Sequence, residues 1–364
     1  MSRVLPAPEA LAAAVSGRDR LALAQALNLL DDRRPAARQC AAAFLDALPS
    51  EKLDTGGHLI GITGPPGAGK SSLTAALIQV WRRRGLKVAI LAVDPSSPIT
   101  GGALLGDRLR MHASGADREV FIRSLACRGE FGGLSAEVWP MSLAMLAAFD
   151  IVLVETVGVG QKEIDVSKMT DTTCFVAQPA SGDSIQFLKA GIMEVPHVVV
   201  VNKEDIGMAA RKTLSELKNT LRRQMDPEGW EVPALSASAA LGSGIEKLAD
   251  ALESHRQWLL GQGQFTARRQ RCQAEWLVKH LREEFGRYGI GLLGGEEALF
   301  TALAEAPRRS PIAEYESLRE RLLNALKTCI PAPLGGEDQG EGKQPSPLIP
   351  LPQGEREFAQ DFNR

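Results

Sequence analysis

Seven short apolar runs alternate with helical stretches from about residue 56 onward, and this alternation restricts the fold more than any other feature. Each run is rich in Val and Ile, which is typical of strands buried on both faces of a parallel sheet. The runs are His58–Thr63, Lys87–Val93, Glu119–Ser124, Ile151–Glu155, Thr173–Gln178, His197–Val201 and Glu231–Ser236. The helical stretches between them include Lys70–Arg84, Leu134–Ala148, Ile185–Met193, Met208–Met225 and Ile245–Leu260. The sequence therefore predicts an α/β domain with a doubly wound, mostly parallel sheet.

The segments outside this domain read as helical or disordered, which divides the chain into four parts. Residues 1–50 form a helical N-terminal arm, residues 51–262 the α/β domain, residues 263–330 a helical C-terminal region and residues 331–364 a tail. The tail holds six Pro and five Gly among mostly polar residues, so we expect it to be disordered.

Two apolar stripes at helical spacing mark the C-terminal region. They consist of Cys272, Trp276, Leu277, Leu281 and Phe285, and of Tyr315, Leu318, Leu322, Leu326 and Ile330. A helical hairpin with this much apolar surface either caps the α/β domain or forms a dimer. The stripes alone leave both interpretations open.

Composition argues against several kinds of partner and site. The chain has 42 Lys and Arg against 44 Asp and Glu, so its charge favours neither a nucleic acid nor a membrane surface. No apolar run reaches the roughly 18–20 residues of a membrane helix. The five Cys and five His lack ligand spacing, which argues against disulfides or zinc and predicts a cytoplasmic location.

The run Gly64-Pro65-Pro66-Gly67-Ala68-Gly69-Lys70-Ser71 lies between a predicted strand and a predicted helix, as a phosphate-binding P-loop does. Its glycines allow a tight loop whose backbone N–H groups point at phosphates. Lys70 is predicted to place a positive charge on the β- and γ-phosphate oxygens, and the Ser71 hydroxyl to bind Mg²⁺. We count Ser72, at the start of the helix, among the nucleotide-binding residues. The fold is thus predicted to be that of a P-loop NTPase.

A second motif, Asn202-Lys203-Glu204-Asp205, follows a later strand of the same sheet and indicates which base is bound. The Asp205 carboxylate can accept from both N1–H and N2–H of guanine, whereas adenine offers neither donor. Asn202 and Lys203 complete this box. Ser236-Ala237-Ser238, at the end of the next strand, is expected to supply a backbone contact to guanine O6.

Glu155-Thr156-Val157-Gly158 closes another strand in the arrangement of a Walker-B acid and switch II. Glu155 is predicted to hold Mg²⁺ or its water, and the Gly158 N–H to reach the γ-phosphate. Val159 occupies the position where Ras-like GTPases carry the glutamine that orients the attacking water, and Gln161 is the candidate substitute. We therefore expect slow intrinsic hydrolysis that depends on a partner.

Two further acids complete the predicted Mg²⁺ site. Asp94 ends the strand Lys87–Val93, which we expect to lie beside the P-loop strand, and Asp107 follows in Gly106-Asp107-Arg108. Carboxylate oxygens near phosphates suit Mg²⁺, which prefers oxygen ligands and retains several waters.

Taken together, these residues resemble the MeaB/ArgK-like GTPases, chaperones of adenosylcobalamin-dependent acyl-CoA mutases in the signal-recognition/MinD/BioD class of P-loop proteins. The likeness spans roughly residues 10–330. The matching stretches are Gly61–Ser71, Val93–Met111, Phe121–Leu134, Val154–Gln161, Gly182–Glu194 and Val200–Asp205.

The resemblance implies a role for each matching residue. Gly67, Gly69, Lys70 and Ser71 would hold the phosphates of GTP or GDP. Mg²⁺ would be held by Ser71, Asp94, Asp107 and Glu155, and guanine would be read by Asn202, Lys203 and Asp205. It also implies a homodimer formed through the C-terminal helices, and a partner that is methylmalonyl-CoA mutase or a relative. GTP would gate delivery of adenosylcobalamin and the ejection of damaged cofactor, with Gly182–Lys189 as a switch that senses the mutase.

Three alternatives remain. An ATP-using kinase or ATPase linked to transport of basic amino acids (arginine, ornithine) is disfavoured by the Asn202–Asp205 box. A nickel-inserting GTPase of the same class would need His- or Cys-rich sites, which this chain lacks. A GTPase of an unrelated pathway would share the fold without sharing the partner.

Overall fold

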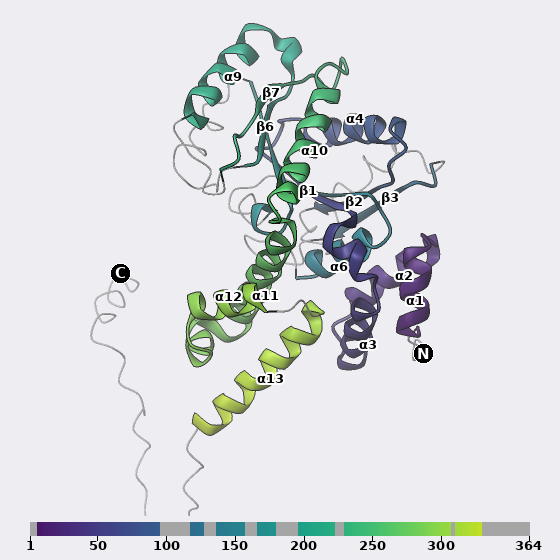
Figure 1. Ribbon diagram of the computed structural model, residues 1–364, viewed down its shortest axis with the longest axis vertical. Coiled ribbons are helices and arrows are strands. Elements are labelled where there is room, and N and C mark those ends of the chain that lie inside the picture. Colours follow the sequence, from purple (N-terminus) through teal and green to yellow (C-terminus); the bar gives the residue numbers. More distant parts are fainter. Residues whose placement is uncertain are drawn as a thin grey trace, which may run out of the picture. The chain divides into compact units, whose positions relative to one another are not determined.

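The computed structural model describes residues 6–94, 117–126, 136–156, 166–179, 196–222, 229–306 and 310–329 (Figure 1). Met1–Ala325 form one compact unit and Leu326–Arg364 a second. The predicted helix Ile185–Met193 and the predicted tail lie outside the described residues.

The centre of the fold is a seven-stranded sheet in the order β3-β2-β4-β1-β5-β6-β7, and every recorded strand pair is parallel. The predicted α/β fold class is thereby confirmed. The strands are β1 (His58–Thr63), β2 (Val88–Asp94), β3 (Val120–Ala126), β4 (Ile151–Thr156), β5 (Thr172–Ala177), β6 (Val198–Val201) and β7 (Ala234–Ser236).

One expectation about this sheet is wrong. β2 does not lie beside β1, because β4 is inserted between them and pairs with both. A helical crossover can pass over a neighbouring position in the sheet as easily as fill it, so chain order does not decide strand order. The insertion matters for function because it puts the end of β4 next to the loop that follows β1.

The described helices mostly match the predicted ones, with shifted ends. They are α1 (Pro8–Ser16), α2 (Arg20–Leu30), α3 (Pro35–Asp46), α4 (Lys70–Arg83), α6 (Val138–Leu146), α9 (Met208–Leu221), α10 (Ile245–Gly261), α11 (Phe265–Leu292), α12 (Glu296–Glu305) and α13 (Pro311–Cys329). A π-helical turn η1 (Lys52–Gly56) and a 3₁₀ turn η2 (Glu204–Ile206) were not predicted. Among the described helices, none is both long and apolar enough to cross a membrane.

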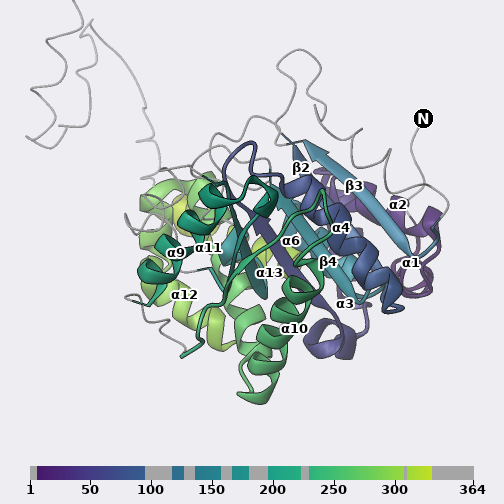
Figure 2. The same ribbon diagram turned by 90° about the horizontal axis from the view of Figure 1, so that it is seen from above.

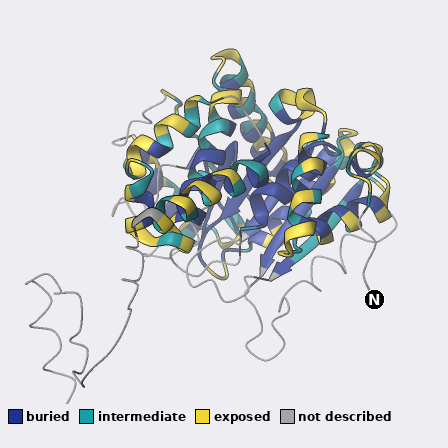
Figure 3. Cartoon of the chain, turned by 90° about the horizontal axis from the view of Figure 1, so that it is seen from below, coloured by how far each residue is buried: buried dark blue, intermediate teal, exposed yellow. Residues whose placement is uncertain are grey.

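Helices cover both faces of the sheet (Figures 1 and 2). Residues of β1, β2 and β4 alternate between a cluster shared with α4 and α10 and a second cluster shared with α6. Residues of β5 and β6 alternate between the first of these and a third cluster, which is shared with α9. Every residue of β1, β5 and β6 is buried, as the near-continuous apolar runs predict (Figure 3). The sheet is therefore the centre of the core and carries its loops at the carboxyl edge.

The arm and the C-terminal helices pack into the cluster that also holds α6 and one face of the sheet. Within α13, Tyr315, Leu318 and Leu322 of the second predicted stripe are buried there, as are the first four residues of the first stripe. The described part of the C-terminal region is not a two-helix hairpin: it consists of α11, which is interrupted by non-helical backbone at Gly286, followed by α12 and α13. Because these side chains are covered within one chain, the expected dimer interface remains a prediction that cannot rest on them.

Candidate nucleotide-binding site

The P-loop connects β1 to α4 at the middle of the carboxyl edge of the sheet. Gly64, Gly67 and Gly69 all have positive φ, at 141°, 78° and 84°. A Cβ on Gly64 would overlap the carbonyl oxygen of Val176, and one on Gly69 would lie 2.5 Å from Asn202 Nδ2. Glycine is required at these two positions both for the backbone conformation and for the close approach of neighbouring groups.

Lys70 and Ser71, the first two residues of α4, lie where the motif predicts. The Lys70 side chain is buried, and its Nζ donates to the carbonyl oxygens of Gly64 at 2.7 Å and Pro65 at 3.1 Å. The ammonium group is thus held over the loop. Ser71 Oγ donates to Oε1 of Glu155 at 2.5 Å, and Glu155 is only 4% exposed at the end of β4.

The contact between Ser71 and Glu155 brings together two of the four predicted Mg²⁺ ligands. A hydroxyl and a buried carboxylate are oxygen donors of the kind that Mg²⁺ prefers, so this pair fits the ion. Asp94 ends β2 at the same edge, one residue past the pairing of Val93 with Thr156. Its side chain, like the whole of Asp107, lies outside what is described. Elsewhere in the described segments, no group of three or more His, Cys, Asp or Glu could hold a metal.

Two of the predicted catalytic residues, Gly158 and Gln161, also fall outside the described residues. The two others are described: Lys70 is the first residue of α4, and Glu155, at the end of β4, accepts from Ser71.

The guanine box is bonded directly to the P-loop. Asn202 is 2% exposed, and its Nδ2 donates to the carbonyl oxygens of Ala68 at 2.9 Å and Gly69 at 3.3 Å. Its Oδ1 accepts from the backbone N–H of Ala239 at 3.2 Å. Lys203, with φ of 61°, donates from Nζ to the carbonyl oxygen of Gly67 at 2.7 Å. The two motifs, about 130 residues apart in sequence, therefore line one site.

Asp205 is exposed at this site and is oriented by the neighbouring loop. Its Oδ1 accepts from Ser238 Oγ at 2.5 Å, and the same hydroxyl oxygen accepts from the backbone N–H of Leu241 at 3.2 Å. The preceding residue, Glu204, makes a similar bond, because its Oε1 accepts from Ser236 Oγ at 3.0 Å.

The backbone donors predicted to meet guanine O6 are already used inside the protein. The N–H of Ala237 donates to Val201 and that of Ser238 to Ser243, both at 2.9 Å. The N–H of Ala239, the next along the loop, donates to Asn202 Oδ1 at 3.2 Å. The sequence Ser236-Ala237-Ser238-Ala239 offers the same Ser-Ala pair in two registers, and the bond from Ser238 Oγ to Asp205 places the second pair beside the base-reading carboxylate. The sequence analysis did not assign Ala239, which bonds Asn202, or Glu204, which bonds the loop beside Asp205.

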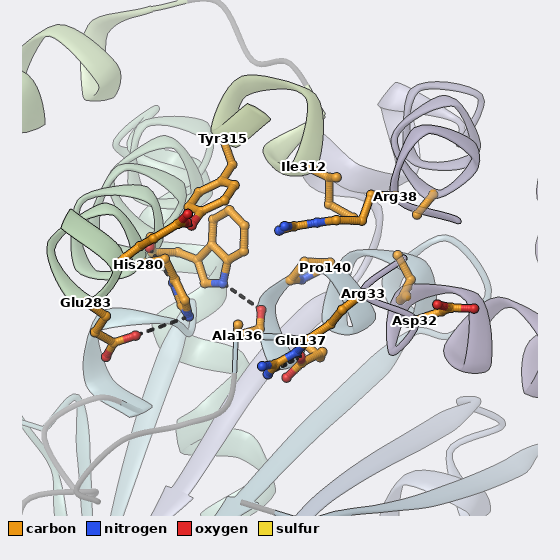
Figure 4. A pocket seen from close by; sticks show the side chains of 14 residues that line it. Asp32, Arg33, Arg38, Ala136, Glu137, Pro140, His280, Glu283, Ile312 and Tyr315 are labelled. Atoms are coloured by element: carbon orange, nitrogen blue, oxygen red, sulfur yellow. Dashed lines mark hydrogen bonds and ion pairs between the residues drawn. The ribbon is translucent and has the colours of Figure 1, made fainter. Parts of the chain in front are cut away.

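A separate cavity of about 320 Å³ lies where α2, α3, α6, α11 and α13 meet (Figure 4). It contains no residue of the predicted nucleotide site. Arg33 donates to Glu137 at 2.8 Å, and the Arg38 guanidinium lies 5.2 Å from the centre of the Tyr315 ring. These pairs join the arm to the rest of the core across the cavity.

The P-loop joins a central parallel strand to its helix, and the buried acid Glu155 bonds Ser71 at its end. The Asn-Lys-x-Asp turn is hydrogen-bonded to the same loop. These features together define a P-loop GTPase. The particular family follows from sequence. The chain belongs to the family described as methylmalonyl Co-A mutase-associated GTPase MeaB, whose match covers residues 23–288.

Named relatives agree with this assignment. The chain is 38% identical to the GTPase ArgK of Escherichia coli over 73% of this chain and 81% of that protein. It is 32% identical to the mitochondrial methylmalonic aciduria type A homolog of Caenorhabditis elegans, over 73% and 70% of the two chains. A crystal structure described as a LAO/AO transport system kinase superposes with a TM-score of 0.63 at 27% identity, covering 90% of this chain and all of that one. This protein is therefore a GTPase, which hydrolyses GTP to GDP and phosphate.

Proposed function

We propose that this GTPase is a chaperone that gates the loading of adenosylcobalamin onto a B12-dependent acyl-CoA mutase and helps to reactivate it. The observation that carries the proposal is the family match, because the family is described by its association with methylmalonyl-CoA mutase. The name of the Caenorhabditis elegans relative points to the same metabolism. The client is methylmalonyl-CoA mutase or a relative, and the GTPase acts in the cytoplasm as a homodimer.

In the proposed mechanism, the protein mainly positions the nucleotide and neutralises its charge. The P-loop N–H groups and Lys70 bind the phosphates. Ser71 and Glu155, with Asp94 and Asp107, would hold Mg²⁺, which offsets charge on the β- and γ-phosphates when it is bound. Asp205 reads the two N–H donors of guanine while Ser238 orients its carboxylate.

The intrinsic rate is expected to be slow. Val159 stands where a water-orienting glutamine is usual, and the proposal assigns that task to Gln161, with Gly158 at the γ-phosphate. Binding of the mutase would accelerate hydrolysis. Whether GTP or GDP is bound would then depend on whether the mutase is bound.

A second candidate function is that of an ATPase or kinase linked to transport of basic amino acids. The likeness to the solved LAO/AO transport system kinase favours it. A nucleotide competition assay separates the two proposals, because the Asn202–Asp205 turn should make GTP displace a bound fluorescent nucleotide at far lower concentration than ATP. A preference for ATP would support the transport-linked function instead.

The base-reading assignment is tested by Asp205→Asn. An amide can donate to the 2-oxo group of xanthine, so we expect this variant to exchange its preference for GTP for a preference for XTP. Each nucleotide's kcat/KM should change by roughly tenfold or more, as for a charge-assisted pair. Lys70→Ala is the matched control, because it should weaken GTP and XTP alike. An Asp205→Asn variant that still prefers GTP would show that Asp205 does not read the base.

The client is tested by affinity purification with the purified protein as bait. An adenosylcobalamin-dependent acyl-CoA mutase should be retained, to a different extent with a non-hydrolysable GTP analogue than with GDP. Retention of no mutase in either state would contradict the chaperone proposal while leaving the GTPase activity untouched.

A further inference from the structure

We infer that Glu204, the variable residue of the Asn-Lys-x-Asp turn, is a positioning residue that sets how strongly the protein selects guanine. This inference rests on the proposed role of Asp205 in reading the base. Glu204 itself is not placed against the nucleotide. It acts on Asp205, its neighbour in the chain, and on the loop that orients Asp205.

Glu204 is bonded to the facing loop through both its side chain and its backbone. Its Oε1 accepts from Ser236 Oγ at 3.0 Å, and its N–H donates to the carbonyl oxygen of Ala237 at 3.0 Å. Asp205 binds Ser238 of the same loop. Glu204 and Asp205, consecutive in η2, thus accept hydrogen bonds from Ser236 and Ser238 of the loop. With the backbone bond of Glu204, three hydrogen bonds join the turn to the loop.

The turn needs such anchors because its backbone is not in a common conformation. Lys203 has a φ of 61° and Gly207 a φ of 77°, so residues with positive φ stand on both sides of η2. A non-glycine residue in this region is held there by surrounding contacts rather than by its own preference. Lys203 is anchored to Gly67 on one side, and Glu204 supplies the anchor on the other.

The charge of Glu204 also bears on Asp205. Two adjacent carboxylates repel each other, and each is here compensated by a serine hydroxyl that donates to it. Loss of the Ser236 bond removes the hydroxyl that compensates the Glu204 carboxylate and one of the contacts between η2 and the loop. We therefore expect loss of this bond to loosen Asp205 and leave the P-loop unchanged.

Selectivity between GTP and ITP is the readout that isolates this role. ITP lacks the 2-amino group, so it forfeits one of the two bonds to Asp205 while keeping every phosphate contact. A residue that positions Asp205 changes the ratio of kcat/KM for GTP and ITP. A residue with a merely structural role, or one that acts on the phosphates, lowers both values together.

The experiment compares Glu204→Ala, Glu204→Gln and Ser236→Ala in the full-length protein. We expect Glu204→Ala to lower the GTP/ITP ratio by roughly three- to tenfold, through KM, with kcat for GTP within about twofold of the unmodified protein. Glu204→Gln keeps an acceptor oxygen and should retain the ratio. Ser236→Ala should lower the ratio as Glu204→Ala does, and the double variant should lower it no further.

Glu253→Ala is the matched control, because Glu253 lies on α10 and binds Gln257 and Arg256 of the same helix. If Glu204→Ala does not fold, Ser236→Ala alone decides the question. An unchanged ratio in Glu204→Ala and Ser236→Ala, beside an Asp205→Asn variant that has lost its preference for GTP, would overturn this inference and leave the base site intact. If Asp205→Asn keeps its preference for GTP, the proposed base site itself is wrong.

Discussion

Gly61, in the middle of the P-loop strand, shows how one missing side chain positions a functional segment. A Cβ at this position would overlap Cγ1 of Val166 and lie 3.0 Å from Oγ1 of Thr170. Both residues belong to the turn that leads from the predicted switch II into β5, and both are fully buried. The absent side chain allows this turn to pack directly on β1.

At this scale we predict that Gly61→Ala lowers the free energy of unfolding by about 1–3 kcal/mol, because the added methyl overpacks the core. Urea denaturation measures the change. Val166→Ala removes the atom that would be overlapped, so Gly61→Ala/Val166→Ala should be more stable than the sum of the two single losses implies. Additive losses would show that the two residues do not meet.

At the scale of elements, three histidines lie together at the amino edge of the sheet, opposite the P-loop. They are His58 at the start of β1, His197 just before β6 and His255 on α10. The Thr172 hydroxyl lies 2.6 Å from His58 Nε2 and 2.7 Å from His255 Nδ1, and the ring of His197 stacks on that of His255 with centroids 4.2 Å apart. Burial, reinforced by neighbouring arginines, lowers the pKa of His58 and His197 well below 6.5. Burial is also the main reason that the pKa of His255 falls to about 3. The folded protein therefore keeps these rings neutral.

This cluster predicts sensitivity to acid. Because the folded pKa values are lowered, the unfolded chain binds more protons below about pH 6.5, so stability is fully present above that pH and falls as pH decreases. Because an unfolded histidine takes up its proton only around pH 6.5, the integrated cost between about pH 7.5 and about pH 5.5 is about 1.4 kcal/mol per histidine, or about 4 kcal/mol for all three. Urea denaturation at both pH values checks this. His255→Asn keeps a polar group near Thr172 and should lose about a third of the difference, whereas an undiminished difference would contradict the assignment.

For the whole molecule, the main consequence of the fold is that the arm and the C-terminal helices belong to the same core as the sheet. Leu27 of α2 is completely buried in that core, whereas Leu21 of the same helix is 67% exposed. If the arm did not share a core with the GTPase domain, neither leucine would contribute much to the stability of that domain.

These two leucines form a matched pair for a test. Leu27→Ala should lower the free energy of unfolding of the whole protein by about 2–5 kcal/mol, and Leu21→Ala by less than about 0.5 kcal/mol. Unfolding followed by circular dichroism and by loss of GTP binding should give coincident transitions for Leu27→Ala. A separate, earlier transition of the arm would show that it folds independently.

Sequence reasoning reached most of the candidate site because its motifs are local. Asn202, Lys203 and Asp205 come just after β6, Lys70 and Ser71 follow the short loop after β1, and the carboxyl ends of parallel strands meet at one edge. Glu155 was placed for the same reason. Glu204 was passed over because no motif assigns that position, and Ala239 because the repeated Ser-Ala pair reads equally well in either register.

The amino-acid sequence by itself determined the α/β class, the P-loop and the identity of the base. The class depends on short-range periodicity, the P-loop on backbone freedom at glycine, and the base on the hydrogen-bonding capacity of single side chains. Only the tertiary structure decided that β4 separates β1 from β2, that the N–H groups of Ala237 and Ser238 are bonded within the protein, and that most of the described residues of the C-terminal stripes are buried within one chain. Strand order, register and the covering of an apolar face depend on which distant segments compete for the same space, and no local pattern encodes the outcome of that competition.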